Sequence, residues 1–220
     1  MANFGFTRLA VVAPFEAHWR EAKSAVGASD LLQSAKSAKC LPDAVADCTL
    51  VIGTGTLEHR KPEQPVIPLP ELVPLIQNEL ARGGRIALVF GSEKRGLTQE
   101  DLAHCRILTV IPTDPQQPSM NLGQAVAVCL YEIASRTGET APEANPEPAS
   151  DTVAPASARD LDLLAGVVEQ TMLAAKYSPA AMRKANRHDL HLLLHRLALN
   201  RRDASRILGF FRRILWRLNQ

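Results

Sequence analysis

Two segments of this sequence place an apolar strand directly before a loop and then a helix. Residues 87–97 read Ala-Leu-Val-Phe-Gly-Ser-Glu-Lys-Arg-Gly-Leu, and residues 111–123 read Ile-Pro-Thr-Asp-Pro-Gln-Gln-Pro-Ser-Met-Asn-Leu-Gly. Strands that alternate with helices form parallel sheets, and ligands bind beyond the carboxyl ends of such strands. The pair therefore predicts an α/β fold with a ligand site built from two neighbouring strand ends.

The same alternation runs through the first 136 residues. Apolar runs typical of strands alternate with stretches typical of helices. We predict a mostly parallel sheet covered by helices on both faces. The expected strands are 7–13 (buried, and ended by Pro14), 49–52, 85–90 and 106–111, and the expected helices are 16–38 (broken near Gly27), 70–82 and 122–136.

The chain changes character after residue 136. Residues 137–157 are rich in Pro, Ala and Glu and nearly free of large apolar side chains, which predicts a linker. Residues 158–220 show helical spacing of apolar residues and predict a small all-helical extension to an α/β domain over 1–136. Its helices are expected at roughly 159–176, around 190–197 and from about 203.

Charge is distributed unevenly between these parts. The whole chain has 25 Lys and Arg against 23 Asp and Glu, a net charge of +2. Residues 158–220 alone hold 12 basic and 5 acidic side chains, a net +7, which leaves −5 for residues 1–157. A basic extension favours binding to a polyanion such as RNA, with a solvated arginine-rich face as the alternative. The expected RNA-binding residues are Arg183, Lys184, Arg187, Arg201 and Arg202.

Composition also bears on the compartment. No apolar run reaches the roughly 18 residues that a membrane-spanning helix needs, and the N-terminus enters a strand-like run with no secretory signal. The four cysteines, Cys40, Cys48, Cys105 and Cys129, form no Cys-x-x-Cys pair, which argues against zinc ribbons and disulfide frameworks. We expect a protein of the reducing cytoplasm.

Two nucleotide-binding patterns fit the loops poorly. Gly91 and Gly96 have the spacing of a phosphate-binding loop. Leu97, however, stands where that loop has the lysine that reaches the outer phosphates. Residues 53–56 (Gly-Thr-Gly-Thr) lack the third glycine of a dinucleotide fingerprint. Triphosphate hydrolysis and a Rossmann-type oxidoreductase are therefore disfavoured.

Three histidines of the extension, His188, His191 and His195, are spaced to share one helix face. Zinc sites use such spacing, but no Cys or carboxylate cluster accompanies them, and Arg187 and Arg196 add positive charge. We predict solvated or RNA-facing histidines and no metal site. Three aromatic residues are expected in the core rather than as base-stacking platforms: Phe210, Phe211 and Trp216.

The loop before the 122–136 helix is unusually specific. Ser119 fits the N-cap of that helix. The N–H groups at a helix start attract polar or anionic ligand groups. Asn121 offers both a donor and acceptors. Ser-x-Asn-Leu after a Pro-rich loop, downstream of a Gly-x-Glu loop, is more particular than a plain capping turn requires.

Taken together, the two loops resemble those of the SpoU/TrmH group of knotted (SPOUT) RNA 2′-O-ribose methyltransferases. Residues 90–97 match the second motif of that family, Phe-Gly-x-Glu-x-x-Gly-Leu. Ile111-Pro112 and residues 119–122 (Ser-Met-Asn-Leu) match its third. The resemblance covers about residues 3–136, and the helical tail is similar to that of the TrmJ-like subgroup, which modifies the anticodon loop of tRNA.

The resemblance implies a trefoil knot late in the α/β domain, a homodimer, and S-adenosylmethionine as methyl donor. It implies methylation of a ribose 2′-oxygen in tRNA, at an anticodon-loop nucleotide, with ribosomal RNA as the alternative substrate. Glu93 would organise its loop, and Ser119 and Asn121 would position cofactor and ribose, as the catalytic set. The residues implied around the cofactor are Thr54, Gly55, Thr56, Gly91, Ile111, Ser119, Met120 and Asn121.

One family motif is missing. The family has Asn-x-Gly-x-x-x-Arg before a segment like residues 1–6 (Met-Ala-Asn-Phe-Gly-Phe), and its arginine is assigned to activating the hydroxyl. Two explanations stay open: a start codon placed too far downstream, or a shortened homologue that binds S-adenosylmethionine or RNA without efficient turnover. We expect this 220-residue form to be a poor catalyst, with dimerisation altered by a bare sheet edge or face.

Overall fold

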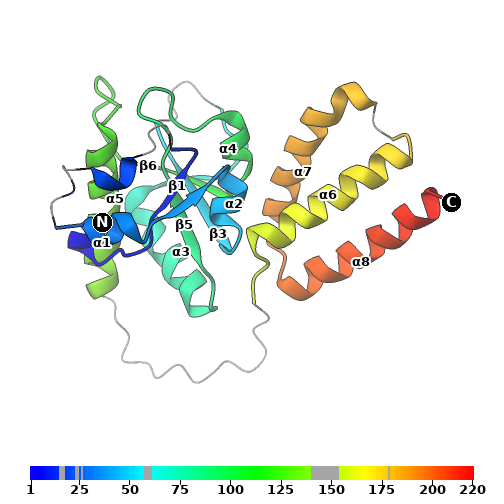
Figure 1. The fold of residues 1–220 in the computed structure, drawn as a ribbon, viewed down its shortest axis with the longest axis horizontal. Helices are drawn as coiled ribbons and strands as arrows, with labels where there is room; N and C mark the ends of the chain where they lie inside the picture. The colour runs from blue at the N-terminus through cyan, green and yellow to red at the C-terminus, as the bar shows by residue number, and fades with distance from the viewer. Residues whose placement is uncertain (15–17, 23–24, 26, 57–60, 140–153, 178) are drawn as a thin grey trace.

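The computed structural model describes residues 1–220 except 15–17, 23–24, 26, 57–60, 140–153 and 178 (Figure 1). An α/β domain carries three long helices on one side. In chain order the α/β domain contains η1 (Ala2–Phe4), β1 (Ala10–Val12), η2 (Trp19–Glu21), α1 (Ser29–Gln33), β2 (Lys36–Ala38), α2 (Leu41–Val45), β3 (Leu50–Thr54), β4 (Val66–Pro68), α3 (Leu69–Ala81), β5 (Ile86–Val89), α4 (Gln99–Ala103), β6 (Ile107–Val110) and α5 (Leu122–Glu139). The extension contains α6 (Ala158–Ala174), η3 (Ala180–Met182), α7 (Arg183–Leu197) and α8 (Arg201–Leu218).

The main sheet has four parallel strands in the order β4-β6-β3-β5. Ile52 of β3 lies opposite Leu88 of β5 on one side and Ile107 of β6 on the other. Since all strands run the same way, the carboxyl ends of β3, β5 and β6 meet at one edge of the sheet. The predicted parallel sheet is confirmed, and its strands at 49–52, 85–90 and 106–111 lie within two residues of the observed ones.

Both faces of the main sheet are covered, because successive side chains of a strand point to opposite faces. Leu50 and Ile52 pack against α3 and α5. Val51, between them, packs against α2 and α4 on the other face. Ile52 and Leu72 of α3 are 0% exposed. The continuous apolar strands of the sequence are thus explained by burial on two sides.

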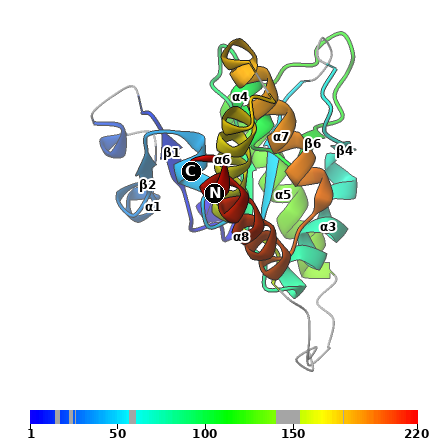
Figure 2. The ribbon, with the colours of Figure 1, turned by 90° about the vertical axis from the view of Figure 1, so that its right-hand side faces the viewer.

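The N-terminal part differs from the prediction. Strand β1 pairs in parallel with β2 in a separate two-stranded sheet, which lies to one side of the main sheet (Figure 2). Val12 is 38% exposed, so this strand is not buried as predicted. The helix predicted over 16–38 is also wrong, because the described residues there form η2, α1 and β2. Gly27 has a φ of 72°, a left-handed conformation that interrupts a helix.

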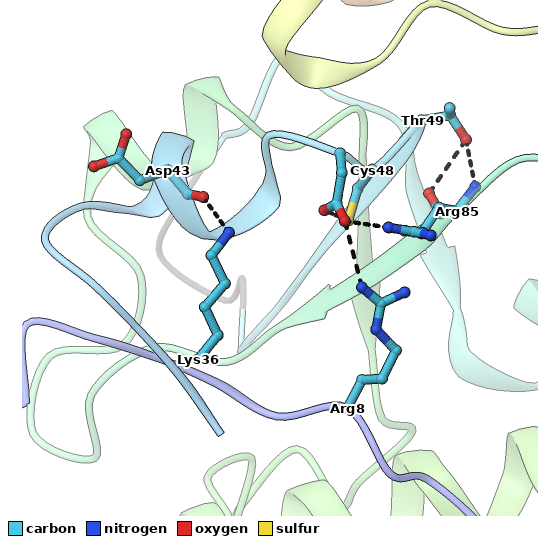
Figure 3. Close-up of polar contacts among 7 residues, drawn as sticks. Arg8, Lys36, Asp43, Cys48, Thr49 and Arg85 are labelled. Atoms are coloured by element: carbon cyan, nitrogen blue, oxygen red, sulfur yellow. Dashed lines mark hydrogen bonds and ion pairs between the residues drawn. The ribbon is translucent and has the colours of Figure 1, made fainter. Parts of the chain in front are cut away.

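Polar contacts tie this N-terminal part to the main sheet (Figure 3). Asp47, between α2 and β3, accepts a bond from Arg8 at 3.3 Å and pairs with Arg85 just before β5. Burial raises the pKa of Asp47, but the hydrogen bond and charge of Arg85 outweigh it and hold that pKa below its usual value. Lys36 of β2 donates to the Asp43 carbonyl at 2.7 Å. These bonds fix the small sheet beside the large one.

The extension docks on the α/β domain through the first turn of α6. The N–H of Ala158 donates to the Cys48 carbonyl at 2.7 Å, and that of Arg159 donates to the Ala46 carbonyl at 3.1 Å. The Ala158 side chain joins the apolar cluster under α2 and α4. Within the extension, Leu164 is 0% exposed among residues of α6, α7 and α8. The three predicted helices are confirmed.

The predicted linker is described only at its ends. Helix α5 continues to Glu139, beyond the predicted end at 136. Pro155 forms a β-bridge with Asn200, and Ala156 is 3% exposed. Residues 140–153 lie outside the described residues. No helix in the described parts of the chain has the length and apolar character to cross a membrane.

Candidate functional site

A pocket of about 590 Å³ lies at the sheet edge where β3, β5 and β6 end. Residues 54–56 line it after β3, residues 90–97 after β5, and the end of β6 with its following loop closes it. Helix α5 begins at its rim, with Leu122 and Ala125 among the lining side chains. The volume falls within the roughly 300–1,000 Å³ of small-molecule sites. The pocket therefore lies at the strand ends that the sequence analysis selected.

The structure brings most of the predicted cofactor residues together. Seven of the eight line the pocket; the eighth, Asn121, does not line it. The prediction missed lining residues that are neighbours in the same loops, such as Ser92, Pro112 and Thr113. It also missed Leu102 of α4, for which the sequence gives no signal. The seven are Thr54, Gly55, Thr56, Gly91, Ile111, Ser119 and Met120.

The loop after β5 folds back tightly on Gly91. A Cβ at this position would lie 2.0 Å from the carbonyl carbon of Gly96 and 2.2 Å from the amide nitrogen of Leu97. The Gly96 N–H donates to the Ser92 carbonyl at 2.7 Å, and Gly96 itself has a φ of +66°. The two glycines of the Phe-Gly-x-Glu-x-x-Gly-Leu pattern are thus needed for different reasons: Gly91 for close backbone packing and Gly96 for its positive φ.

Asn121 connects this loop to the start of α5. Its Oδ1 accepts from the Gly123 N–H at 2.9 Å, so Asn121, and not Ser119 as predicted, is the N-cap of α5. The helix begins at Leu122, which leaves Ser119 two residues before the cap. The Nδ2 of Asn121 donates to Glu93 Oε1 at 2.9 Å. The orientation of the Asn121 side chain is fixed, because its oxygen accepts from an N–H and its amide nitrogen donates to a carboxylate.

The pocket combines apolar side chains with hydroxyl and backbone groups. The Thr54 hydroxyl donates to the Val89 carbonyl at 2.9 Å and holds the ends of β3 and β5 together. A Cβ at Gly55 would meet no atom within 4 Å, so a ligand can approach this backbone closely. The N-terminus of α5 adds a positive helix end at the rim. Such a site suits a ligand with an apolar part and a polar or anionic end.

The five predicted RNA-binding residues are all exposed, and they fall into two groups. Arg183, Lys184 and Arg187 lie in the first turns of α7, and Arg201 and Arg202 open α8. The rest of α7 separates the groups by about 20 Å at 1.5 Å per residue. Buried Glu169 of α6 pairs with Arg183 at 2.9 Å and with Arg187 at 3.9 Å, so these two also hold α7 on α6.

Helix α8 is more exposed than predicted. Phe210 is 64% and Trp216 50% exposed, so the core prediction is wrong for both, whereas Phe211 packs in the extension core. The reason is that α8 has a neighbour on one side only, where Ala204 is buried. The Arg213 guanidinium lies 4.4 Å from the Trp216 ring centroid. The exposed arginines that the prediction missed on this helix are Arg206, Arg212, Arg213 and Arg217.

The histidine prediction is wrong for His191, which is 3% exposed and faces neither solvent nor RNA. Burial, followed by the charge of His104, lowers the pKa of His191 to about 3. Burial also lowers the pKa of His195 to about 4. His191 lies between the two parts of the chain, with His104 of the α/β domain and Asp162 of α6 beside it. These companions come from distant parts of the sequence.

Comparisons with known proteins agree with this architecture. Residues 1–131 match the model of the SpoU rRNA Methylase family. The tRNA (cytidine/uridine-2′-O-)-methyltransferase TrmJ of Citrobacter koseri is 32% identical over 100% of this chain and 88% of that protein. The tRNA (cytidine/uridine/adenosine-2′-O-)-methyltransferase TrmJ of Pseudomonas aeruginosa is 37% identical over 60% of this chain.

The fold agrees as well. The crystal structure of TrmJ from Z. mobilis ZM4 superposes with a TM-score of 0.80 at 27% identity, covering 97% of this chain and 89% of that one. The match to the Pseudomonas aeruginosa protein spans 52% of its length. The family model matches more than half of the chain, and relatives align with its full length. The chain therefore belongs to the SpoU rRNA Methylase family, in its TrmJ-like group of RNA 2′-O-methyltransferases.

Proposed function

We propose that this chain transfers a methyl group from S-adenosylmethionine to a ribose 2′-oxygen of tRNA. The Citrobacter koseri relative, which is named as a tRNA 2′-O-methyltransferase, aligns with the whole chain, extension included. The observation that carries the proposal is the pocket at the ends of β3, β5 and β6, because both family motifs contribute to its wall.

The lining fits S-adenosylmethionine. Backbone at Gly55 is open to close approach, and hydroxyls of Thr56 and Ser119 line the same pocket. Leu97 and Met120 supply apolar surface for a flat base. The N-terminus of α5 suits the carboxylate of an amino-acid end. We assign these groups to binding of the cofactor.

When bound, S-adenosylmethionine supplies an electrophilic methyl group, so that a C–O bond to the ribose forms as the S–C bond breaks and the hydroxyl proton is released. The chain must chiefly hold the ribose oxygen in line. Ser119, beside the pocket, would position the ribose and cofactor. Glu93 would act as a positioning residue, since its carboxylate holds Asn121 at 2.9 Å across the two motif loops.

We also propose the trefoil knot and the homodimer for this chain. Strand β6 lies between β4 and β3 although it follows β5 in sequence. The chain therefore crosses the sheet before it enters α5, a course that is compatible with threading. The knot would hold the 111–121 loop against the pocket.

Extension helices α7 and α8 would bind the tRNA, in our proposal at its anticodon loop. Two exposed arginines at the start of α8, Arg201 and Arg202, form no ion pair with an acidic residue in the described parts of the chain. Phosphate contacts of this kind make affinity fall steeply with salt. Arg201→Glu should weaken tRNA binding and reduce the salt slope, whereas Arg82→Glu, exposed at the end of α3, should change neither.

Methyl transfer from labelled S-adenosylmethionine tests the activity, with tRNA and ribosomal RNA as parallel substrates. We expect label in tRNA, at the anticodon loop by nuclease mapping, and binding heat with S-adenosylhomocysteine. Asn121→Ala should lower transfer at least tenfold, while Asn78→Ala, exposed on α3, should not. Label only in ribosomal RNA would refute the substrate, and no binding heat would refute the cofactor site.

A further inference from the structure

Three side chains of the types that bind metals meet between the α/β domain and the extension, outside the proposed cofactor pocket. His104 follows α4, Asp162 lies on α6 and His191 lies on α7. One ligand atom from each lies within 4.8 Å of the other two, and no other such trio of His, Cys, Asp or Glu occurs among the described residues. The cluster draws its members from three elements and from both parts of the chain.

The spacing of Asp162 from each of the two imidazoles is close to that of ligands around a cation. Asp162 Oδ1 is 3.6 Å from His104 Nδ1 and 3.5 Å from His191 Nδ1. A good N–H···O hydrogen bond is shorter, at about 2.9 Å. Two ligands at about 2.0–2.2 Å from a tetrahedral zinc ion lie roughly 3.4 Å apart. Each imidazole therefore lies near ligand separation from the carboxylate, and ligand atoms of the trio that are up to 4.8 Å apart would have to draw in to roughly 3.4 Å around the ion.

His191 is a buried ring that lacks a good hydrogen bond. It is 3% exposed, and its Nε2 has no hydrogen-bond partner among the described residues. Its Nδ1 reaches Asp162 only at 3.5 Å. A buried polar group left this way destabilises a fold. A cation bound at Nδ1, the nitrogen near Asp162, would give that atom a strong partner, and Nε2 would stay without one among the described residues.

The charges near the trio bear on whether a cation can bind there. Asp162 contributes a carboxylate beside the two imidazoles. Arg187 brings positive charge to the region, but Glu169 stands 3.9 Å from it and offsets that charge.

We propose that His104, Asp162 and His191 bind a divalent cation of the zinc type that fastens the helical extension to the α/β domain. Two imidazoles and a carboxylate suit Zn²⁺, and water completes the tetrahedron. Since the ligands come from both domains, the cation stabilises their docked arrangement. The site shares no residue with the pocket, so it stands independently of the proposed methyl transfer.

Zinc titration of the full chain, stripped with a chelator and dialysed, tests the site. Calorimetry should find one equivalent of Zn²⁺, and the melting temperature should rise by about 5–10 °C at a hundredfold excess over Kd. Asp162→Asn and His191→Gln should abolish the rise. His188→Gln removes a histidine from the same helix, outside the trio, and should keep it.

Cobalt provides a second measurement, which does not depend on melting. Tetrahedral Co²⁺ absorbs visible light, and this absorption should appear in the wild type and in His188→Gln but not in His104→Gln. His104 is the arm to use if the Asp162 and His191 variants do not fold, since it lies in the α/β domain at the end of α4. No zinc-dependent rise in the wild type would overturn the proposal. So would a rise that persists in the Asp162 and His191 variants, or a thiolate charge-transfer band that assigns the metal to cysteine.

Discussion

Replacing Gly91 with alanine should open the loop that closes the proposed cofactor pocket. The new Cβ would lie 2.0 Å from the carbonyl carbon of Gly96, 2.2 Å from the Leu97 nitrogen and 2.4 Å from the Gly96 oxygen. Carbon contacts are most favourable at about 3.5–4.0 Å, so the backbone at Gly96 and Leu97 must move away by roughly 1.5 Å. All three atoms belong to the backbone, so no change of rotamer relieves the contact.

The size of the effect follows from where the strain is released. Overpacking costs about 1–3 kcal/mol. Residues 92–96 are all exposed, so the loop moves more easily than the sheet beneath it. We therefore expect the strain to appear as lost affinity. At about 1.4 kcal/mol per tenfold, S-adenosylhomocysteine should bind roughly 10- to 100-fold more weakly.

Calorimetry with S-adenosylhomocysteine measures this loss directly. Gly166→Ala is the matched control, because a Cβ at this position in α6 meets no atom within 4 Å, and alanine favours helix. The control should keep wild-type affinity. Affinity within twofold of the wild type in Gly91→Ala would refute the steric reasoning, even if both variants fold.

Three further predictions concern the extension. Leu164→Ala, at a 0% exposed position, should lower the free energy of unfolding by about 2–5 kcal/mol, whereas Leu163→Ala, at 47% exposure, should lower it far less in the same urea titration. Ser157→Ala should cost about 1 kcal/mol, because its Oγ caps α6 by accepting from the Asp160 N–H at 3.2 Å; equal stability of variant and wild type would contradict this. His191 has a folded-state pKa of about 3, and its pKa in the unfolded chain is near 6.5. The free energy of unfolding should therefore be unaffected by His191 above pH 6.5 and fall by about 1.4 kcal/mol for each pH unit below it. In chelator, His191→Gln should flatten the pH dependence of urea unfolding between pH 7 and 5, and an unchanged slope would contradict the burial argument.

Much of the fold is predictable where long apolar runs decide it. Strands β3, β5 and β6 contribute apolar side chains to the clusters on both faces of the sheet, so their sequences alone define them. The N-terminal part is different. Strand β1 has three residues, and its partner β2 is the Lys-Ser-Ala segment, which shows no strand pattern. Pairing between distant segments, rather than local preference, decides this region.

The site divides in the same way. Residues next to one another in a motif, such as Gly91 and Glu93, can be assigned to a pocket wall because the loop is continuous. The N-cap prediction is wrong because both Ser119 and Asn121 have side chains that suit a helix N-cap. Only the residue at which α5 begins distinguishes them. The buried surroundings of His191 could not be predicted, since Asp162 and His104 reach it from other elements.

The backbone hydrogen bonds from Ala158 and Arg159 to the carbonyls of Cys48 and Ala46 hold the extension at a fixed position on the α/β domain. They set the gap between the pocket and the arginines of α8, whatever the course of the chain between α5 and α6. An RNA that touches both must span that gap, so its own shape selects the nucleotide that enters. Weakening these hydrogen bonds should therefore lower the selectivity for one nucleotide before it lowers the rate of modification.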